Sequence, residues 1–220
     1  MEKYFNVLKK SPLFKQIKER DIFTILKCLA GKIVHYKKDK IIFLEGDIFT
    51  SVGIILSGSV HVTNDDIYGN RTILAELKQG SSFGESFAYA NLEKIPVSVI
   101  AREESYIFMT NCKNIIKKCS NNCIYHNTLI ENMVTIIARK IIMQNEKLII
   151  LSRRSTREKI LTFLSMQSKQ SRSNTFKISF NRQELADYLS VDRSAMSTEL
   201  GKMRDEGLID FYKNSFKLTS

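Results

Sequence analysis

No hydrophobic run in this sequence is long enough to cross a membrane, because spanning a bilayer takes about 20 apolar residues. The opening residues, MEKYFNVLKKSPLF, also lack the uninterrupted apolar core and the small-residue cleavage site of a secretory signal peptide. Hydrophobic residues make up 43% of the chain and charged residues 26%, which is typical of soluble globular proteins. We therefore expect a cytoplasmic protein with no membrane partner.

Cysteines with the spacing of zinc ligands are also absent. There are four cysteines, and Cys112, Cys119 and Cys123 follow the spacing C-x6-C-x3-C rather than the CxxC pairs of zinc and most iron–sulfur sites. They can be free thiols that pack as small apolar side chains. Their concentration within twelve residues leaves a redox or cluster role as the alternative. We predict no metal site and no cofactor.

Motifs of catalysis are missing as well. The sequence shows no nucleophile–base set, no metal-ligand spacing and no phosphate-binding Walker loop, so it does not predict an enzyme. What the chain does have is positive charge. Its formal net charge is +11, and residues 152–220 contain 13 basic and 8 acidic side chains. This excess favours a polyanionic partner such as nucleic acid, with a solvated lysine-rich surface as the alternative.

The pattern of apolar and turn residues changes along the chain. Residues 4–30 have helical apolar spacing that is broken at Ser11–Pro12. From 32 to 111, turn residues separate short β-rich runs, which predicts an antiparallel β-barrel or roll. The runs are KIVHY (32–36), KIIFL (40–44), SVGIILS (51–57), SVHVT (59–63), RTILAEL (71–77), VSVIA (97–101) and SYIFM (105–109).

A long helix is predicted over residues 122–151, where few helix breakers occur. Its apolar positions alternate at spacings of four and three, as in a coiled-coil seam with one polar member. About thirty residues of helix would be about 45 Å long, which favours pairing with a second copy over burial in one small domain. The seam comprises Ile130, Val134, Ile137, Ile141, Gln144, Leu148 and Leu151.

The last third of the chain predicts a winged helix-turn-helix. Ser155 and Glu158 form a capping-box pattern that opens a helix to about Met166, followed by a loop over 168–175 and the short strand FKISF. Asn181 and Glu184 form a second such pattern, and the helix that follows ends before the dipeptide SV. Asp192 then caps another helix, which Gly207 ends, and LIDFYKNSFKL reads as a hairpin. The second helix is expected to bury Ala195, Met196, Leu200 and Met203.

Five polar residues of this motif are candidate DNA contacts. Arg193, Ser194, Ser197 and Thr198 lie near the start of the second helix, where recognition helices reach base edges. Arginine can bind the two acceptors of guanine, and serine or threonine can contact a base or a phosphate. Arg182 begins the preceding helix, where we expect it to contact phosphate. The alternative is a structural helical hairpin with these groups merely solvated.

The order β-roll, long helix and winged helix resembles the Crp/Fnr family of bacterial transcription regulators. The resemblance spans essentially the whole chain and implies an α+β fold with an effector-sensing β-roll domain (1–119), a dimerisation helix (120–151) and a DNA-binding domain (152–220). It also implies a homodimer, a palindromic double-stranded DNA operator and RNA polymerase as a further partner. The motifs are FLEGD (43–47), GIILSGSVHV (53–62), GSSFGESFAY (80–89), ARKIIMQNEKL (138–148) and RQELADYLSVDRSAMSTELGKM (182–203).

The effector loop departs from the family pattern because the stretch from Phe83 to Ala101 contains no arginine. In cAMP-binding members, a Gly-Glu pair precedes an Arg-Ser pair that holds the cyclic phosphate. Here Gly84, Glu85 and Ser86 are present, but Ile95 and Pro96 occupy the Arg-Ser positions. A buried phosphate would lose its charge-assisted hydrogen bonds, so we expect weak or no cAMP binding. Glu85 is then either a ligand contact or a structural carboxylate that accepts backbone N–H bonds.

The sequence does not identify the effector. The family's purine-contacting pair falls at Gln144 and Asn145, although Gln144 can instead set the register of the seam. Phe83, Phe87, Tyr89 and Ile95 suggest an apolar, uncharged effector, and a regulator with no effector fits equally well. Haem would need ligands from among the three histidines, and a cluster would need N-terminal cysteines that the first 27 residues lack. The alternative function is a ligand-binding regulatory subunit that acts through protein partners.

Overall fold

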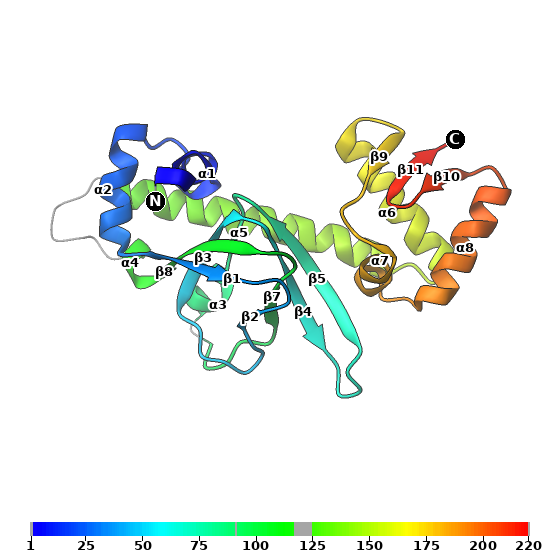
Figure 1. The fold of residues 1–220 in the computed structure, drawn as a ribbon, viewed down its shortest axis with the longest axis horizontal. Helices are drawn as coiled ribbons and strands as arrows, with labels where there is room; N and C mark the ends of the chain where they lie inside the picture. Colours follow the sequence, from blue (N-terminus) through cyan, green and yellow to red (C-terminus); the bar gives the residue numbers. More distant parts are fainter. Residues whose placement is uncertain (1, 91, 117–124, 220) are drawn as a thin grey trace. The chain divides into compact units, whose positions relative to one another are not determined.

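The structure, a computed structural model, describes residues 2–90, 92–116 and 125–219 (Figure 1). The chain divides into two compact units, which are treated separately below. The first unit contains residues 1–69 and 74–141, and the second contains residues 70–73 and 142–220. Cys119 and Cys123, for which a redox role was considered, lie outside the described residues.

Short helices open the first unit: η1 (Glu2–Tyr4), α1 (Phe5–Lys10), η2 (Pro12–Phe14) and α2 (Glu19–Leu29). The predicted break at Ser11–Pro12 is confirmed, because Ser11 is extended and Pro12 starts a new turn. Proline suits a first helical position, where its missing N–H would have no partner. The helix α2 ends at Ala30, which adopts a left-handed conformation.

Two antiparallel sheets form the β-roll. One has the strand order β1-β8-β3-β6 and the other β2-β7-β4-β5. The predicted strands are confirmed with small shifts at their ends, and β6 was not predicted. The strands are β1 (Lys32–Tyr36), β2 (Ile41–Phe43), β3 (Ser51–Ser57), β4 (Ser59–Asp65), β5 (Arg71–Lys78), β6 (Ser82–Phe83), β7 (Ser98–Ala101) and β8 (Ser105–Asn111).

The two faces of the β3–β8 pair bury different cores. Because side chains alternate along a strand, Ile54 and Phe108 pack into a cluster with the N-terminal helices, while Ile55 and Ile107 pack into a second cluster. The second cluster also contains Phe43, Val60, Phe83, Ile95, Val97 and Val99. This second core contains Ile95, one of the residues that the sequence predicts to contact an effector.

The stretch after Phe83 is not a simple loop. Residues Glu85–Ala90 form the short helix α3, which directly follows Gly84, and Lys113–Ile116 form α4. Neither helix was predicted, because four to six residues are too few to show a helical period. Among the described residues of this stretch, 92–97 before β7 keep the irregular backbone expected of a binding loop.

The long helix α5 (Tyr125–Leu151) packs one side of its first half on the roll. Leu129, Met133 and Ile136 join the core with the N-terminal helices, and the Asn132 side-chain amide donates to the carbonyls of Leu13 at 2.9 Å and Lys15 at 2.8 Å. Within the described part of the chain, neither α5 nor any other helix is long and apolar enough to cross a membrane.

The second unit contains α6 (Thr156–Ser171), α7 (Arg182–Leu189) and α8 (Arg193–Asp205), with a sheet of order β10-β11-β9. The strands are β9 (Thr175–Lys177), β10 (Ile209–Tyr212) and β11 (Ser215–Leu218). The predicted end of the first helix near Met166 was wrong, because α6 continues to Ser171 and ends at a left-handed Arg172. Lysine, glutamine and serine do not stop a helix as glycine or proline would, so sequence alone placed the end too early.

Candidate functional site

The helix-turn-helix is fixed by side-chain caps. Asn181 accepts from the backbone N–H of Glu184 at 2.9 Å, and the Glu184 carboxylate accepts from the Asn181 N–H at 2.7 Å. Asp192 accepts from the N–H of Ala195 at 2.7 Å, and the turn passes through a left-handed Ser190. These contacts satisfy backbone donors that a helix start leaves unpaired. The predicted caps are confirmed, so α7 and α8 begin where the sequence placed them.

One face of α8 is buried and the other is open. Met196, Leu200 and Met203 lie in the core of the second unit. The prediction that Ala195 belongs to this buried face was wrong, because Ala195 is exposed. It lies one position before Met196, and the helical period of 3.6 turns it away from the core. The open face presents the predicted contacts Arg193, Ser194, Ser197 and Thr198.

Arg182 lies between the helices and the wing rather than on an open surface. Its guanidinium carbon is 4.9 Å from the ring centroid of Phe211 and 5.1 Å from that of Phe216. Burial lowers the pKa of Arg182 below its usual value. Stacking uses the flat face of a guanidinium, and its N–H donors point outward in the plane. A phosphate contact by Arg182 therefore remains a proposal alongside this packing role.

Arg157 is a positioning residue that the sequence did not reveal. From α6 it donates to Glu206 at 2.9 Å and to Glu199 of α8 at 3.2 Å, so it joins these two helices. The hydrogen bond to Glu206 is the largest cause of the raised pKa of Arg157. Glu199 and Glu206 lie 42 and 49 residues after Arg157 in the chain, so no local sequence pattern indicates these contacts.

The predicted effector residues do not share one environment, because Gly84, Glu85 and Ile95 are buried and the others are exposed. Gly84 has a φ of 85°, and a Cβ there would lie 2.4 Å from an atom of the Phe49 ring, so only glycine fits. Ile95 is 2% exposed, and its backbone is held by hydrogen bonds to Gly46 and Asp47. Ser86 and Pro96 are exposed instead. The sequence between Phe83 and Ala101 has no arginine for a buried phosphate to pair with.

Glu85 is a buried carboxylate with a charged partner. It is 1% exposed and forms an ion pair with the ammonium of Lys140 on α5. Lys140 also donates to the backbone carbonyl of Ser82 at 2.7 Å. Of the two roles considered for Glu85, the structural role predicted that its carboxylate accepts hydrogen bonds from backbone N–H groups. The partner that the structure gives it is a lysine side chain 55 positions further along the chain.

Two further predictions concern Tyr89 and the pair Gln144 and Asn145. Tyr89 does not line the apolar core beside Ile95, because it packs against the core of the N-terminal helices. Burial is the largest cause that raises its pKa to about 12. Phe83 lies in the same apolar cluster as Ile95, and Phe87 packs against it. Gln144 and Asn145 are exposed on the part of α5 that belongs to the second unit.

Metal ligands do not gather among the residues that the structure describes. No group of three histidine, cysteine, aspartate or glutamate residues there could hold a metal ion. His35 bonds Glu104 at 2.8 Å, and His126 bonds the carbonyl of Ile115 at 3.0 Å. Cys112 is buried, with its sulfur 3.6 Å from the carbonyl of Ala88.

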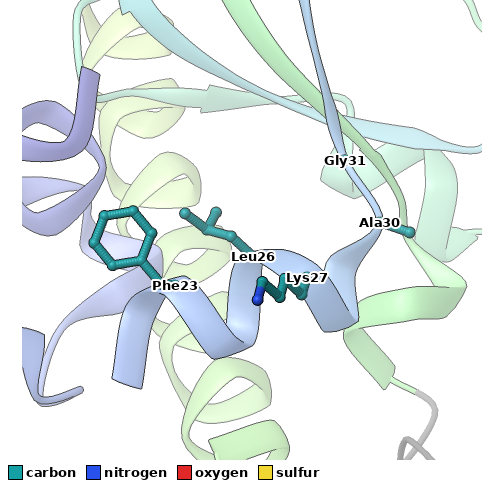
Figure 2. Close-up of a pocket in the computed structure, with 5 residues that line it drawn as sticks. All are labelled: Phe23, Leu26, Lys27, Ala30 and Gly31. Carbon is teal, nitrogen blue, oxygen red and sulfur yellow. The ribbon is translucent and has the colours of Figure 1, made fainter. Parts of the chain in front are cut away.

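A separate hollow of about 330 Å³ lies along α2 and the two residues that follow it. Figure 2 shows its lining, in which Phe23 and Leu26 extend from the helix, Lys27 contributes a cation, and Ala30 and Gly31 follow at its end. The hollow is lined mainly by apolar atoms and is open to solvent. None of the predicted effector residues lines it.

Comparisons with known proteins agree with this organisation. Residues 33–122 match the model of the cyclic nucleotide-binding domain, and residues 158–219 match that of the Crp-like helix-turn-helix domain. The chain is 23% identical over 205 residues to a cyclic AMP receptor protein of Thermus thermophilus, covering 92% of this chain and 89% of that one. It is 22% identical over 179 residues to the transcriptional activator protein FnrA of Stutzerimonas stutzeri, covering 79% and 71%.

Solved structures share the fold. The c-di-GMP responsive global regulator CLP of Xanthomonas campestris superposes with a TM-score of 0.75 at 17% identity, covering 91% of this chain and 100% of that one. FixK2 of Bradyrhizobium japonicum gives a TM-score of 0.67 at 17% identity, covering 86% and 93%. Identities this low establish the fold alone.

Proposed function

The chain belongs to the Crp/Fnr family of transcription regulators, which are not enzymes, and from this we propose that it is a homodimeric, sequence-specific DNA-binding regulator that does not respond to cAMP. The observation that carries the DNA-binding part is α8. Its buried side packs on the core, while Arg193, Ser194, Ser197 and Thr198 are exposed together at its capped start. Helix-turn-helix proteins insert this part of the second helix into the major groove.

Dimerisation is supported by the exposed seam of α5. Val134 is 62% exposed, Ile141 53% and Leu148 62%, although each is a large apolar residue. Gln144 is the polar member of this seam and is exposed as well. Apolar side chains at heptad spacing are stabilised when a second helix covers them. A two-fold dimer would then bind a roughly palindromic operator with half-sites about 10 bp apart or a multiple of that. RNA polymerase is a proposed further partner.

The proposal that cAMP is not the effector rests on Ile95. By its position in the sequence, Ile95 replaces the phosphate-binding arginine of cAMP-binding members, and its side chain is buried. A phosphodiester beside it would be desolvated without compensation. An effector compatible with the buried apolar side chains around Ile95 would be an uncharged or apolar molecule. The protein can also act without an effector, controlled by its own abundance.

Two measurements test the proposal. A ligand that binds only the folded state must raise the melting temperature. Because we expect no binding, a thermal-shift titration with cAMP, cGMP and c-di-GMP should leave the melting temperature unchanged. A saturable rise would contradict the exclusion of cyclic nucleotides. Separately, DNA selected from a random pool should contain an inverted repeat and bind with a steep salt dependence. Retention of protein partners but of no DNA would favour the regulatory-subunit alternative.

A further inference from the structure

The Glu85 site is completed by the chain itself. Glu85 opens α3 directly after Gly84, and its carboxylate is almost fully buried. A buried carboxylate is stable in its charged form only with a cationic or hydrogen-bonding partner. Lys140, on the long helix α5, supplies both an ion pair to Glu85 Oε1 and a hydrogen bond to the Ser82 carbonyl. Both residues belong to the first unit.

The backbone next to Glu85 is packed by an aromatic side chain of the same apolar cluster. Phe49 packs against the backbone of Gly84, and its ring centroid is 4.3 Å from that of Phe43. Ile95 and Phe83 are each 2% exposed in the same apolar cluster. The charge of Glu85 is therefore compensated by a side chain of the same chain, beside a backbone that Phe49 covers.

Lys140 is the main compensation for the buried charge. The second carboxylate oxygen of Glu85 and the hydroxyl of Ser82 are buried and have no hydrogen-bond partner among the described residues. The ammonium of Lys140 is thus the group whose loss would leave Glu85 charged, buried and unpaired. Its neighbour Arg139 is exposed on the same helix and provides a matched control.

We propose that Lys140 is an internal ligand of the β-roll, an alkylammonium carried by the long helix that occupies the Glu85 site in place of a small-molecule effector. This rests on the proposed function, since it assigns the ligand of that regulator's sensing domain. The same helix carries the exposed seam, so the pair fixes the seam-bearing helix to the roll. The regulator then holds its DNA-binding state without added effector.

Stability measurements test the pairing directly. Lys140→Met should lower the melting temperature by about 5–10 °C, because it strands a buried carboxylate. Arg139→Met, which removes an exposed cation of the same helix, should change it little. The double variant Lys140→Met/Glu85→Gln should be more stable than Lys140→Met, because no unpaired charge remains. Equal melting temperatures for Lys140→Met and Arg139→Met would overturn the proposal.

Chemical rescue identifies the ligand class. In Lys140→Ala, propylammonium chloride should raise the melting temperature saturably, while sodium chloride of equal ionic strength should not. The rescue should vanish in Lys140→Ala/Glu85→Gln, which lacks the charged carboxylate. A rise that is equal in both variants would mean that the amine does not act at Glu85 and would overturn the assignment.

DNA binding provides the functional test. On an operator selected by the wild-type protein, Lys140→Met should bind about tenfold more weakly, with recovery in Lys140→Arg, while Arg139→Met stays within about twofold. An unchanged affinity for Lys140→Met would overturn the regulatory part. Failure of the wild-type protein to bind any DNA would instead overturn the proposed function, and the stability and rescue experiments would still decide whether Lys140 is the ligand of Glu85.

Discussion

The guanidinium carbon of Arg182 lies 4.9 Å from the ring centroid of Phe211, so one stacking contact joins the first helix of the helix-turn-helix to the first strand of the wing. The guanidinium of Arg204, near the end of α8, lies 5.3 Å from the same ring. Phe211 is thereby contacted by cations from both helices. The wing and the recognition helix are held as one body, which a protein that reads DNA with both would require.

Arg182→Ala should reduce the free energy of unfolding by about 1 kcal/mol, because the stacking on Phe211 and Phe216 is lost. It should also weaken binding by a similar factor on operator and unrelated DNA, since a wing or phosphate contact carries no base information. Urea unfolding and binding assays on both DNAs measure the two effects. Arg182→Lys keeps the charge but not the planar stacking group and serves as the comparison. A loss restricted to one base position would contradict this role.

Arg193→Ala should cost about 1–3 kcal/mol of operator binding and relax the preference at one base pair. The reason is that an exposed arginine at the start of α8 can bind two acceptors of guanine. Arg193→Lys should lose the base preference while keeping part of the affinity, because lysine lacks the bidentate geometry. Binding to a panel of single-base operator variants checks this. Equal weakening on all variants would show that Arg193 contacts only phosphate.

Ile141→Glu should shift the protein from dimer to monomer, because it places a carboxylate in the apolar seam of α5. Ile142→Glu is a closely matched control, since Ile142 is also exposed but lies outside the seam. Light scattering after size-exclusion chromatography gives the mass of each variant. If both variants remain dimeric, or both dissociate, the seam is not the interface.

Stability should rise between about pH 7.5 and pH 9.5 through Lys147. This residue is buried, with its ammonium 4.1 Å from the ring centroid of Tyr188 and donating to the carbonyl of Ile73. Burial lowers the pKa of Lys147 to about 8, whereas an unfolded lysine keeps a value of about 10.4. Within this window the unfolded chain holds more protons than the folded one, so the unfolding free energy increases with pH, by roughly 2 kcal/mol.

Lys147→Met should remove this pH dependence, and Lys169→Met, at an exposed position of α6, should preserve it. Denaturant unfolding across the pH range measures the difference between variant and wild type. Burial also raises the pKa of Tyr188, so the unfolded tyrosine, with its ordinary pKa of about 10, ionises first, and this opposes the effect of Lys147 only at the upper end of the window. A difference that stays constant with pH would contradict the assignment to Lys147.

Local sequence rules predicted the parts of the fold that depend on neighbours in the chain. Asn181 with Glu184, Ser155 with Glu158, and Asp192 each reach backbone N–H groups within one helical turn. The β-rich run SVGIILS, bounded by turn residues, likewise located β3 at its observed ends, Ser51 and Ser57. These signals come from steric and hydrogen-bonding preferences that act over a few residues.

Contacts between distant segments escaped prediction. The partner of Glu85 is on another helix, and Arg157 meets two carboxylates on and beside α8. Arg182 was placed as a phosphate contact because of its position at a helix start, and its stacking on Phe211 depends on how the wing folds back. In each case a flexible charged side chain can reach many positions, and only the tertiary fold selects one.

If the exposed seam of α5 is the dimer interface, the amount of protein in a cell becomes part of its control. If only the dimer reads a palindrome, then at concentrations well below the dissociation constant of the dimer, doubling the protein raises the dimer about fourfold by mass action. Occupancy of an operator would then change more steeply than expression itself. A gene switched by such a protein would have a threshold set by dosage, even with no small molecule to sense.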